Sequence, residues 1–484
     1  MDKIKIPILE MLEAHRGKVP LSLHVPGHKN GSMVHPRTPS GLQSAMSWDM
    51  TELTGLDDLH SPEEGIKEAE TLLSSFYQTD RSYLLVNGST VGNLAMILGV
   101  IQPGEKVLVQ RNCHKSVMNG LELARANPIF IHPELDAEGV EIGLTASVIN
   151  KYLHRHPDTK AIILTYPNYY GMAMDLEGLI KEAHCLHIPV LVDEAHGAHY
   201  AAGDPFPPSA LLHGADIVVH SAHKTLPAMT MGSYLHIQGN LVSAEQVERY
   251  VRMLQSSSPS YPIMLSLDLA RAYLEGYGEL DKQYLQEQIQ LLKDYLASHK
   301  QLAVYETEDA DWLDPLKLMI YHRGGLSGQK LQAKLEEAGL YPELSTDRFV
   351  LFVLPLLKEG EEYFIKELIA RIESIVWNEG MGAQARHTAL IQDEVNRREH
   401  SELALSYEEM ERLQVDRQPL SLAIGEIAAE AVIPYPPGIP LIQRGERITE
   451  EVAEACQKLL EQGIKIQGGM YLKEGEIQVF KRGL

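Results

Sequence analysis

One lysine, Lys224, follows a hydrophobic stretch and lies among small polar residues. The stretch reads Ala215-Asp-Ile-Val-Val-His-Ser-Ala-His-Lys-Thr-Leu-Pro227, and its β-branched residues 217–219 predict a buried strand. In an open α/β sheet, ligands bind beyond the carboxyl ends of the strands. A lysine there can form an imine with a carbonyl compound or with pyridoxal 5'-phosphate (PLP), and neighbouring hydroxyls and an imidazole can meet a phosphate. Taken alone, the pattern is more typical of a surface lysine, so the interpretation depends on partners elsewhere.

A second candidate is the turn Asn87-Gly-Ser-Thr-Val-Gly92, between a predicted strand at 82–86 and a predicted helix at 91–101. Free backbone N–H groups, the helix dipole and the hydroxyls of Ser89 and Thr90 could hold a phosphate there. On this motif alone, an ordinary helix N-cap is the better interpretation.

A third candidate, Asp193, ends the apolar stretch Val190-Leu-Val-Asp-Glu-Ala-His196. A buried aspartate needs a cationic partner or several donors to stay ionised, and the protonated ring nitrogen of PLP is such a partner. The alternative is a helix cap or a structural carboxylate. Lys224 follows 31 residues later, after the next predicted strand. The convergence of these signals on one sheet edge favours a single cofactor site.

The elements that must position these residues alternate between strands and helices. Hydrophobic patterns predict strands at 82–86, 106–110, 128–132, 161–165, 189–192 and 217–219. They predict helices at 8–15, 66–77, 91–101, 115–126, 144–154 and 176–186. Repeated βα units of this length predict an α/β fold, with a mostly parallel sheet covered by helices on both faces.

The pattern changes beyond residue 261. We expect a long helix at 265–296, then a smaller α+β domain with an antiparallel or mixed sheet. Its strands are predicted at 303–306, 316–320, 341–344 and 349–354, and its helices at 328–338 and 361–375. Residues 380–419 are predicted to be polar and helical, within an appended module. The predicted division is an N-terminal segment, a PLP-binding domain, a small domain and a C-terminal module, at 1–65, 66–264, 265–378 and 379–484.

Composition limits the classes of function. The chain has 484 residues, 44% hydrophobic and 23% charged, which is typical of a soluble protein with two or more domains. Its net charge of -23 argues against a nucleic-acid partner and favours cationic small molecules, although solubility explains the charge equally well. Three widely spaced cysteines without a CxxC motif argue against disulfides and structural zinc. No secretion signal and no long uncharged apolar stretch occurs, so we expect a cytoplasmic protein without a membrane span.

Five motifs extend over most of the chain. They are Ser221-Ala-His-Lys224, Asp193-Glu-Ala-His-Gly-Ala-His199, Gln110-Arg-Asn-Cys-His-Lys-Ser116, His24-Val-Pro-Gly-His-Lys29 and Pro434-Tyr-Pro-Pro-Gly-Ile-Pro440. In combination they resemble the bacterial ornithine/lysine/arginine decarboxylases, which are PLP-dependent and have the aspartate-aminotransferase fold.

The resemblance implies that Lys224 carries PLP as an imine, that Asp193 pairs with the pyridine nitrogen and that His114 stacks on the ring. An exposed loop histidine is the alternative for His114. The phosphate contacts implied by the resemblance come from Ser89, Thr90, Ser221 and His223, and His196 is a further cofactor contact. The stretch Ser256-Ser-Ser-Pro-Ser-Tyr261 resembles the segment that brings residues such as Ser257 and Ser258 to a neighbouring subunit's cofactor.

That last segment implies a homodimer. The His-Val-Pro-Gly-His loop begins at residue 24, which leaves no room for the amino-terminal wing domain of larger family members. Because the wing builds the family's decamers, we expect a dimer or tetramer, and we do not expect acid-stress regulation to transfer.

The expected reaction is decarboxylation of arginine, lysine or ornithine to the corresponding polyamine-pathway amine. The substrate amine displaces Lys224, Asp193 keeps the electron sink charged, and the released Lys224 or His223 protonates Cα. His196 and His199 lack a third ligand, so no metal site is expected. The substrate cation needs a carboxylate, for which the sequence offers four equivalent candidates that are also ordinary solvated acids: Asp57, Asp58, Glu343 and Glu446.

Arginine would favour a bidentate carboxylate contact, whereas lysine or ornithine would need a point charge. Two alternatives remain open at this stage. An aminotransferase or aldolase on the same fold would hold the substrate carboxylate in the ring plane, usually with an arginine. A non-catalytic protein would hold PLP without turnover.

Overall fold

A computed structural model describes residues 4–361, 363, 365–377, 399–434, 440–461 and 465–481. The chain divides into two compact units. Unit 1 comprises the chain up to Val100 together with Pro189–Asp204 and Pro208–Gly278, and unit 2 comprises Ile101–Ile188, Pro205–Pro207 and the chain from Glu279 onward.

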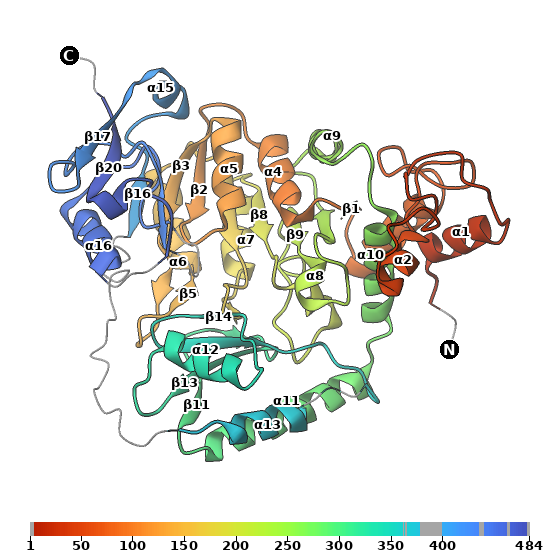
Figure 1. Cartoon of the computed structure of the whole chain (residues 1–484). Helices are drawn as coiled ribbons and strands as arrows, with labels where there is room; N and C mark the ends of the chain where they lie inside the picture. The colour runs from red at the N-terminus through yellow and green to blue at the C-terminus, as the bar shows by residue number, and fades with distance from the viewer. Residues whose placement is uncertain are drawn as a thin grey trace. The chain divides into compact units, whose positions relative to one another are not determined.

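Unit 1 contains four strands in the order β1-β10-β9-β8, labelled in Figure 1 except for β10. The strands are β1 (Arg81–Leu85), β8 (Val190–Asp193), β9 (Ile217–His220) and β10 (Ser233–Ile237). Its helices are α1 (Pro7–Arg16), α2 (Ser40–Met46), α3 (Gly65–Tyr77), α4 (Gly88–Val100), η1 (Ala198–Ala202), α8 (Ala222–Thr225), α9 (Ala244–Leu254) and α10 (Tyr261–Glu275). β8 and β9 run parallel, whereas β10 is antiparallel to both β9 and β1. The predicted strands at 82–86, 189–192 and 217–219 are confirmed to within about one residue, and β10 and α9 were not predicted.

Helix α4 packs against strands β1, β9 and β10. Two glycines permit this arrangement. Gly88, with φ +83°, lets the chain turn sharply from β1 into the helix. A Cβ at Gly92 would lie 2.7 Å from a methyl carbon of Val219, so only glycine lets α4 approach β9 this closely. The helix therefore begins at Gly88 and includes Ser89 and Thr90 in its first turn.

Unit 2 contains a second group of four strands, in the order β6-β2-β3-β16. The strands are β2 (Lys106–Gln110), β3 (Asn127–Ile131), β6 (Ala161–Thr165) and β16 (His400–Glu402), and the associated helices are α5 (Lys115–Ala124), α6 (Ala146–Arg155) and α7 (Glu177–Cys185). β2 is parallel to both β3 and β6, and β16 is antiparallel to β3. The predicted strands at 106–110 and 161–165 are confirmed residue for residue, as is the α/β character of this part of the chain.

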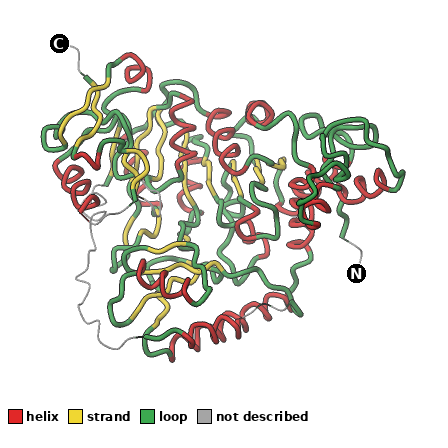
Figure 2. The backbone as a smooth tube through the Cα atoms, in the orientation of Figure 1, coloured by secondary structure: helices red, strands yellow, loops and turns green. Residues whose placement is uncertain are grey.

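A separate sheet of unit 2 has the order β11-β13-β15-β14 and is antiparallel throughout. Its strands are β11 (Leu302–Tyr305), β13 (Lys317–His322), β14 (Leu344–Ser345) and β15 (Phe349–Val353). Figure 2 shows this sheet as a group of yellow strands, against which α12 (Gly328–Glu337) packs. Helices α11 (Glu279–Ser298) and α13 (Ile365–Ser374) lie side by side in Figure 1.

The remaining short elements of unit 2 form strand pairs and a C-terminal cluster. The strands are β4 (Glu134–Leu135), β5 (Glu141–Gly143), β7 (Met172–Ala173), β12 (Trp312–Leu313), β17 (Val415–Pro419), β18 (Val432–Pro434), β19 (Ile466–Gly468) and β20 (Glu476–Phe480), and the helices are α15 (Tyr407–Arg412), α16 (Glu450–Glu461) and η2 (Leu472–Glu474). Apolar residues of α16, including Val452, Cys456 and Leu459, pack with Ile477 and Val479 of β20. This cluster gives the C-terminal module its own core.

Two predictions about the second half of the chain are wrong. The long helix at 265–296 is two helices, α10 and α11, which end and begin around Gly276 and Gly278. Glycine loses the most backbone freedom in a helix, so this pair of glycines favours a break. Residues 399–419 hold two strands, β16 and β17, and only the short helix α15 rather than a continuous helix, and 380–398 lie outside the described residues.

Residues 435–439 of the Pro434-Tyr-Pro-Pro-Gly-Ile-Pro440 motif also lie outside the described residues. Within the described part of the chain, no helix combines the length and apolar character needed to cross a bilayer.

Candidate active site

Lys224 lies in the short helix α8, which follows β9 directly. Its Nζ is 3.0 Å from Nε2 of His196, which comes three residues after the end of β8. Lys224 is exposed, whereas His196 is buried. Because β8 and β9 are parallel, their carboxyl ends bring both residues to one edge of the sheet. The imidazole can therefore exchange a proton with the lysine amine.

Asp193, the last residue of β8, is only 3% exposed. Its Oδ2 accepts a hydrogen bond of 2.8 Å from Nδ2 of Asn93, and its Oδ1 accepts one of 3.2 Å from the backbone N–H of Ala195. Both donors are neutral. Hydrogen bonds from neutral donors leave the carboxylate available to a cationic partner such as a protonated ring nitrogen.

Asn93 itself was missed in the sequence. It lies on α4 and is 1% exposed, in the apolar stretch Val91-Gly-Asn-Leu-Ala-Met-Ile97. A buried amide in an otherwise apolar helix must have hydrogen-bond partners, and that was the available signal. Its contact with Asp193 makes Asn93 a positioning residue for the carboxylate.

Two hydroxyls meet at the start of α4. Ser221 Oγ donates a hydrogen bond of 2.7 Å to Ser89 Oγ, and Ser89 lies in the first turn of the 13-residue helix. Thr90 lies in the same turn and is exposed. Hydroxyls beside the unpaired N–H groups of a helix start form a suitable anion site. The structure thus brings Ser89 and Ser221 together, although they lie far apart in the sequence.

His223 precedes Lys224 and is half-buried. Its Nδ1 lies 2.9 Å from the carbonyl oxygen of Gly232 and acts as the donor when that nitrogen carries the proton. Burial lowers the pKa of His223, an effect that the hydrogen bond to Gly232 opposes and the nearby Lys224 reinforces. The imidazole therefore favours its neutral form, with Nε2 available as an acceptor.

The serine-rich segment 256–261 lies beside the turn at 87–92 of its own chain. The backbone N–H of Ser256 donates a hydrogen bond of 3.0 Å to Oδ1 of Asn87, and Gln255 Oε1 accepts one of 2.8 Å from Val86. Ser257 and Ser258 are exposed. Their predicted role at a neighbouring subunit's cofactor remains a prediction.

His114 belongs to unit 2, where it is the N-cap residue of α5. Its Nδ1 lies 2.7 Å from Ser116 Oγ and accepts a hydrogen bond of 3.2 Å from the backbone N–H of Ser116. The imidazole is thus held in one orientation by its own helix start. Stacking of His114 on the cofactor remains a prediction.

The four acids predicted as candidates for the substrate cation have different surroundings. Both oxygens of Asp57 accept backbone hydrogen bonds of 2.9 to 3.2 Å, and the donors are Asp58, Glu63, Glu64, Ile66 and Lys67. This is a cap at the start of α3. Asp58 accepts a hydrogen bond of 2.8 Å from the backbone N–H of His60.

The other two acids lie in unit 2. Glu446 is buried in an ion pair of 3.0 Å with Arg111, and it also accepts hydrogen bonds from Ser401 and from the backbone of Gln443. Glu343 is exposed and accepts a hydrogen bond of 2.7 Å from Tyr169. Asp57 and Glu446 therefore have structural contacts that leave little room for a ligand, whereas Glu343 is accessible.

A buried polar network, also missed in the sequence, adjoins Asp193. Glu194 Oε2 accepts hydrogen bonds from Ser209 Oγ (2.9 Å) and the Ala210 N–H (3.1 Å), and it lies 3.2 Å from His220 Nε2. The network continues from His220 to His236 at 3.1 Å. Burial raises the pKa of Glu194, against the opposing effect of His220.

Burial also lowers the pKa of His236 well below its usual value, so this ring is neutral. His236 Nδ1 lies 2.8 Å from Ser82 Oγ, which extends the network into β1. The polar contacts thus connect β1, β10 and β9 with the residue next to Asp193, and they hold the strand ends in register.

Comparisons with known proteins agree with this geometry. Residues 6–306 match the family model described as "Orn/Lys/Arg decarboxylase, major domain", and residues 389–466 match "Orn/Lys/Arg decarboxylase, C-terminal domain". The chain is 43% identical over 478 residues to "Uncharacterized protein YaaO" of Bacillus subtilis, covering 98% of each protein. It is 33% identical over 481 residues to "Arginine decarboxylase" of the same organism, covering 97% of this chain and 96% of the relative.

A solved structure shows the same fold. The crystal structure of the Francisella novicida lysine decarboxylase LdcF superposes with a TM-score of 0.80 at 20% sequence identity, covering 99% of this chain and 81% of that one.

Proposed function

The chain belongs to the Orn/Lys/Arg decarboxylase family and decarboxylates a basic amino acid, and we propose that it uses PLP at Lys224 and prefers arginine. The preference for arginine rests on similarity. The relative named arginine decarboxylase is 33% identical over nearly its whole length, whereas the lysine decarboxylase structure, at 20% identity, supports the fold alone.

The residues around Lys224 fit PLP. The paired hydroxyls of Ser89 and Ser221 suit its phosphate, and the buried carboxylate of Asp193 suits its ring nitrogen. The single observation that carries the proposal is the 2.7 Å contact between Ser221 and Ser89, because it joins the lysine segment to the helix start that would hold the phosphate. When bound, PLP supplies an electron sink for the electron pair released as the bond from Cα to the carboxylate breaks.

The residues of the chain then have distinct tasks. Asp193, oriented by Asn93, would stabilise a positive charge on the ring nitrogen. Lys224 would hold the cofactor through its amine, and the free amine would donate a proton to Cα of the substrate. His196, with Nε2 3.0 Å from Nζ, is placed to supply a replacement proton to that amine. His223 is the alternative proton donor, and its neutral ring must first take up a proton at Nε2, because Nδ1 faces the carbonyl oxygen of Gly232.

We further propose that the active unit is a cytoplasmic homodimer that makes an amine of the polyamine pathway. The exposed Ser257 and Ser258 support the dimer, because they follow Ser256, which bonds to Asn87 of the turn at 87–92, and they are accessible to another chain. Size measurement of the PLP-loaded protein in solution tests this. A monomer with full activity would contradict it.

Product identification tests the function. Purified PLP-loaded protein is offered arginine, lysine and ornithine separately, and carbon dioxide and the organic product are identified. We expect agmatine from arginine. Cadaverine or putrescine alone would reassign the substrate within the family, a keto acid would indicate an aminotransferase, and an imine absorbance band without any amine would indicate a non-catalytic PLP protein.

A further inference from the structure

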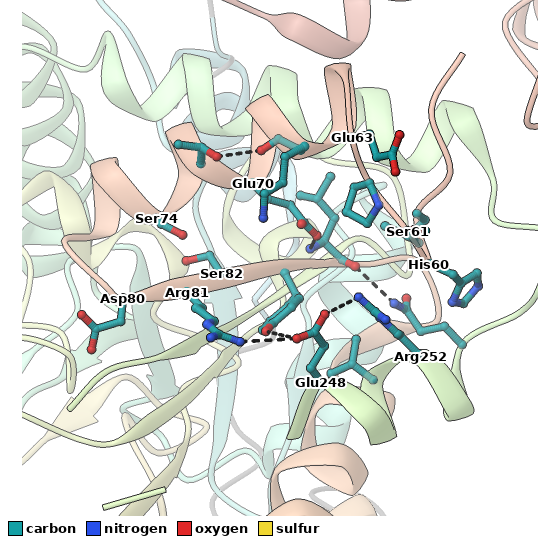
Figure 3. A pocket seen from close by; sticks show the side chains of 18 residues that line it. His60, Ser61, Glu63, Glu70, Ser74, Asp80, Arg81, Ser82, Glu248 and Arg252 are labelled. Carbon is teal, nitrogen blue, oxygen red and sulfur yellow. Dashed lines mark hydrogen bonds and ion pairs between the residues drawn. The ribbon is translucent and has the colours of Figure 1, made fainter. Parts of the chain in front are cut away.

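Unit 1 contains a cavity of about 440 Å³ that lies between α3, β1 and α9 (Figure 3). Its polar lining includes Glu70 and Ser74 from α3, Ser82 and Tyr83 from β1, and Glu248 and Arg252 from α9. Lys224, Asp193, His196, Ser221 and Ser89 do not line it. A cavity of this size can enclose a small organic molecule.

Glu70 is a buried acid of the cavity that has no ion pair among the described residues. Its side chain is 6% exposed, and its Oε1 accepts one hydrogen bond of 3.2 Å from the backbone N–H of Leu84. Among the residues that the structure describes, no lysine, arginine or histidine lies within ion-pair distance of Glu70, and its one hydrogen bond is the one from Leu84. A buried carboxyl group with one backbone donor is costly unless it is protonated or meets a cation.

The arginines of the cavity already have partners. Arg81 forms ion pairs with Glu245 at 2.8 Å and with Glu248 at 3.4 Å. Arg252 pairs with Glu248 as well, and Tyr83 donates a hydrogen bond of 3.4 Å to the same carboxylate. Figure 3 shows the contacts of Glu248 as dashed lines on the side of the cavity opposite Glu70. Since both guanidinium groups are paired with acids, the site does not favour an anion.

We propose that this cavity binds a small organic cation with ammonium or guanidinium N–H donors, and that Glu70 is its counter-ion. Ser74, one turn further along α3, offers a hydroxyl oxygen as a further acceptor in the cavity lining. Basic amino acids and their amine products have this chemistry, so the enzyme would contact them at a second place besides Lys224. That last identification rests on the proposed function, whereas the cation site itself does not.

Proton release supplies a signature of binding. Burial raises the pKa of Glu70 to about 8, so the carboxyl group of the empty cavity is protonated at neutral pH. A cation binds the ionised form and must displace this proton. The charged and titratable groups that face Glu70 or share its cavity are Asp57, His60, Glu63, Lys67, Asp80, Arg81, Tyr83, Glu248 and Arg252. Below pH 8 the affinity of the cavity for a cation should therefore increase as the pH increases, by up to about tenfold per pH unit.

Calorimetric titration with agmatine tests the proposal. The PLP-loaded protein is first reduced with borohydride, so that agmatine cannot form an imine at the cofactor. It is then titrated near pH 7 in two buffers with different heats of ionisation, which reveals the protons released. We expect agmatine to bind with release of nearly one proton per chain.

Three variants identify the place of binding. Glu70→Gln removes the charge with little change in shape, Ser74→Tyr fills the cavity and retains Glu70, and Glu63→Gln makes the same chemical change at an exposed acid on the cavity rim. We expect Glu70→Gln and Ser74→Tyr to weaken this binding by about tenfold or more and to abolish the proton release, and Glu63→Gln to resemble the wild type. Unchanged binding in a folded Glu70→Gln protein, or no agmatine binding to the wild type, would overturn the proposal.

An arginine turnover assay on the same proteins separates this inference from the proposed function. Proton-linked agmatine binding in a protein that does not decarboxylate arginine would leave the cavity site standing and remove the proposed substrate. Normal turnover of arginine without agmatine binding at the cavity would leave the proposed function standing and overturn the cavity site.

Discussion

Two polar regions of unit 1, the one around Lys224 and the cavity beside α3, differ in the hydrogen-bond and ion-pair partners of their side chains. Around Lys224 the polar groups form close pairs: Ser221 with Ser89, Asp193 with Asn93, and Lys224 with His196. In the cavity beside α3, the arginines are paired with acids, and Glu70 has a single backbone donor. The first region is organised before any ligand arrives, as catalysis requires. The second region has a buried carboxyl group without an ion pair among the described residues, which indicates binding rather than chemistry.

Loss of the lysine amine should have the largest effect. We expect Lys224→Ala to lower kcat/KM for arginine by about a thousandfold or more, because covalent attachment and proton transfer both require that amine. Steady-state kinetics and the imine absorbance band measure the loss. Lys67→Ala, which removes an exposed lysine of the cavity rim, is the matched control and should retain activity. Equal losses of activity in both variants would show that the region around Lys224 is not more important for catalysis than the cavity rim.

The next effect concerns the carboxylate of Asp193. Asp193→Asn should lower kcat/KM by about a hundredfold, since a neutral amide cannot hold the positive charge on the ring nitrogen. Asn93→Ala should cost about tenfold, because it loosens the carboxylate without removing it. Kinetics at saturating PLP measure both. A near-normal Asp193→Asn enzyme would show that the carboxylate is structural.

The pH dependence of stability should distinguish Glu70. Its pKa in the folded protein, about 8, lies above its ordinary value, so between the two values the unfolded chain releases a proton that the folded chain keeps. The free energy of unfolding should therefore fall with rising pH, by about 1.4 kcal/mol per unit from this group, and this contribution should level off above pH 8. Urea unfolding from pH 5.5 to 7.5 should show a shallower decline for Glu70→Gln than for the wild type. Glu63→Gln should keep the wild-type slope, and identical slopes in all three proteins would contradict the assignment.

The smallest effect should come from the hydroxyl pair. Ser89→Ala and Ser221→Ala should each weaken PLP binding by about 1 kcal/mol, the usual contribution of one hydrogen bond. If the two hydroxyls contact one phosphate while bonded to each other, the double variant should lose less binding free energy than the sum of the two single losses. Equilibrium dialysis against PLP measures these affinities. Additive losses would place the two hydroxyls at independent contacts.

Much of the fold was predictable because periodicity is local. Alternating strand and helix patterns located β2, β6, β8 and β9, and with them the strand ends that bear Asp193 and Lys224. β10 was missed because Ser233-Tyr-Leu-His-Ile237 mixes polar and apolar residues, although all five are buried. His236 explains this, because its partners Ser82 and His220 come from neighbouring strands and are invisible in a one-dimensional pattern.

The site was predictable only in part, for a related reason. Lys224, Asp193 and Ser89 follow strands, and a sheet brings strand ends together, so their proximity could be inferred. Glu70 could not be identified, because on α3 it resembles any acid between apolar positions, and the cavity exists only where α3, β1 and α9 meet. Asp57 was a candidate for the substrate cation, but its carboxylate accepts hydrogen bonds from backbone N–H groups. The position of an acid in a loop does not reveal such contacts. The domain boundaries after residues 65, 264 and 378 remain predictions.

The attachment of the cofactor to Lys224 is the claim on which the catalytic account depends, and chemical trapping tests it directly. Protein loaded with PLP is reduced with borohydride, digested and mapped by mass spectrometry. The account predicts a pyridoxyl label on the peptide that contains Lys224, with no label in Lys224→Ala. A label on any other lysine, or an undiminished label in that variant, would contradict it.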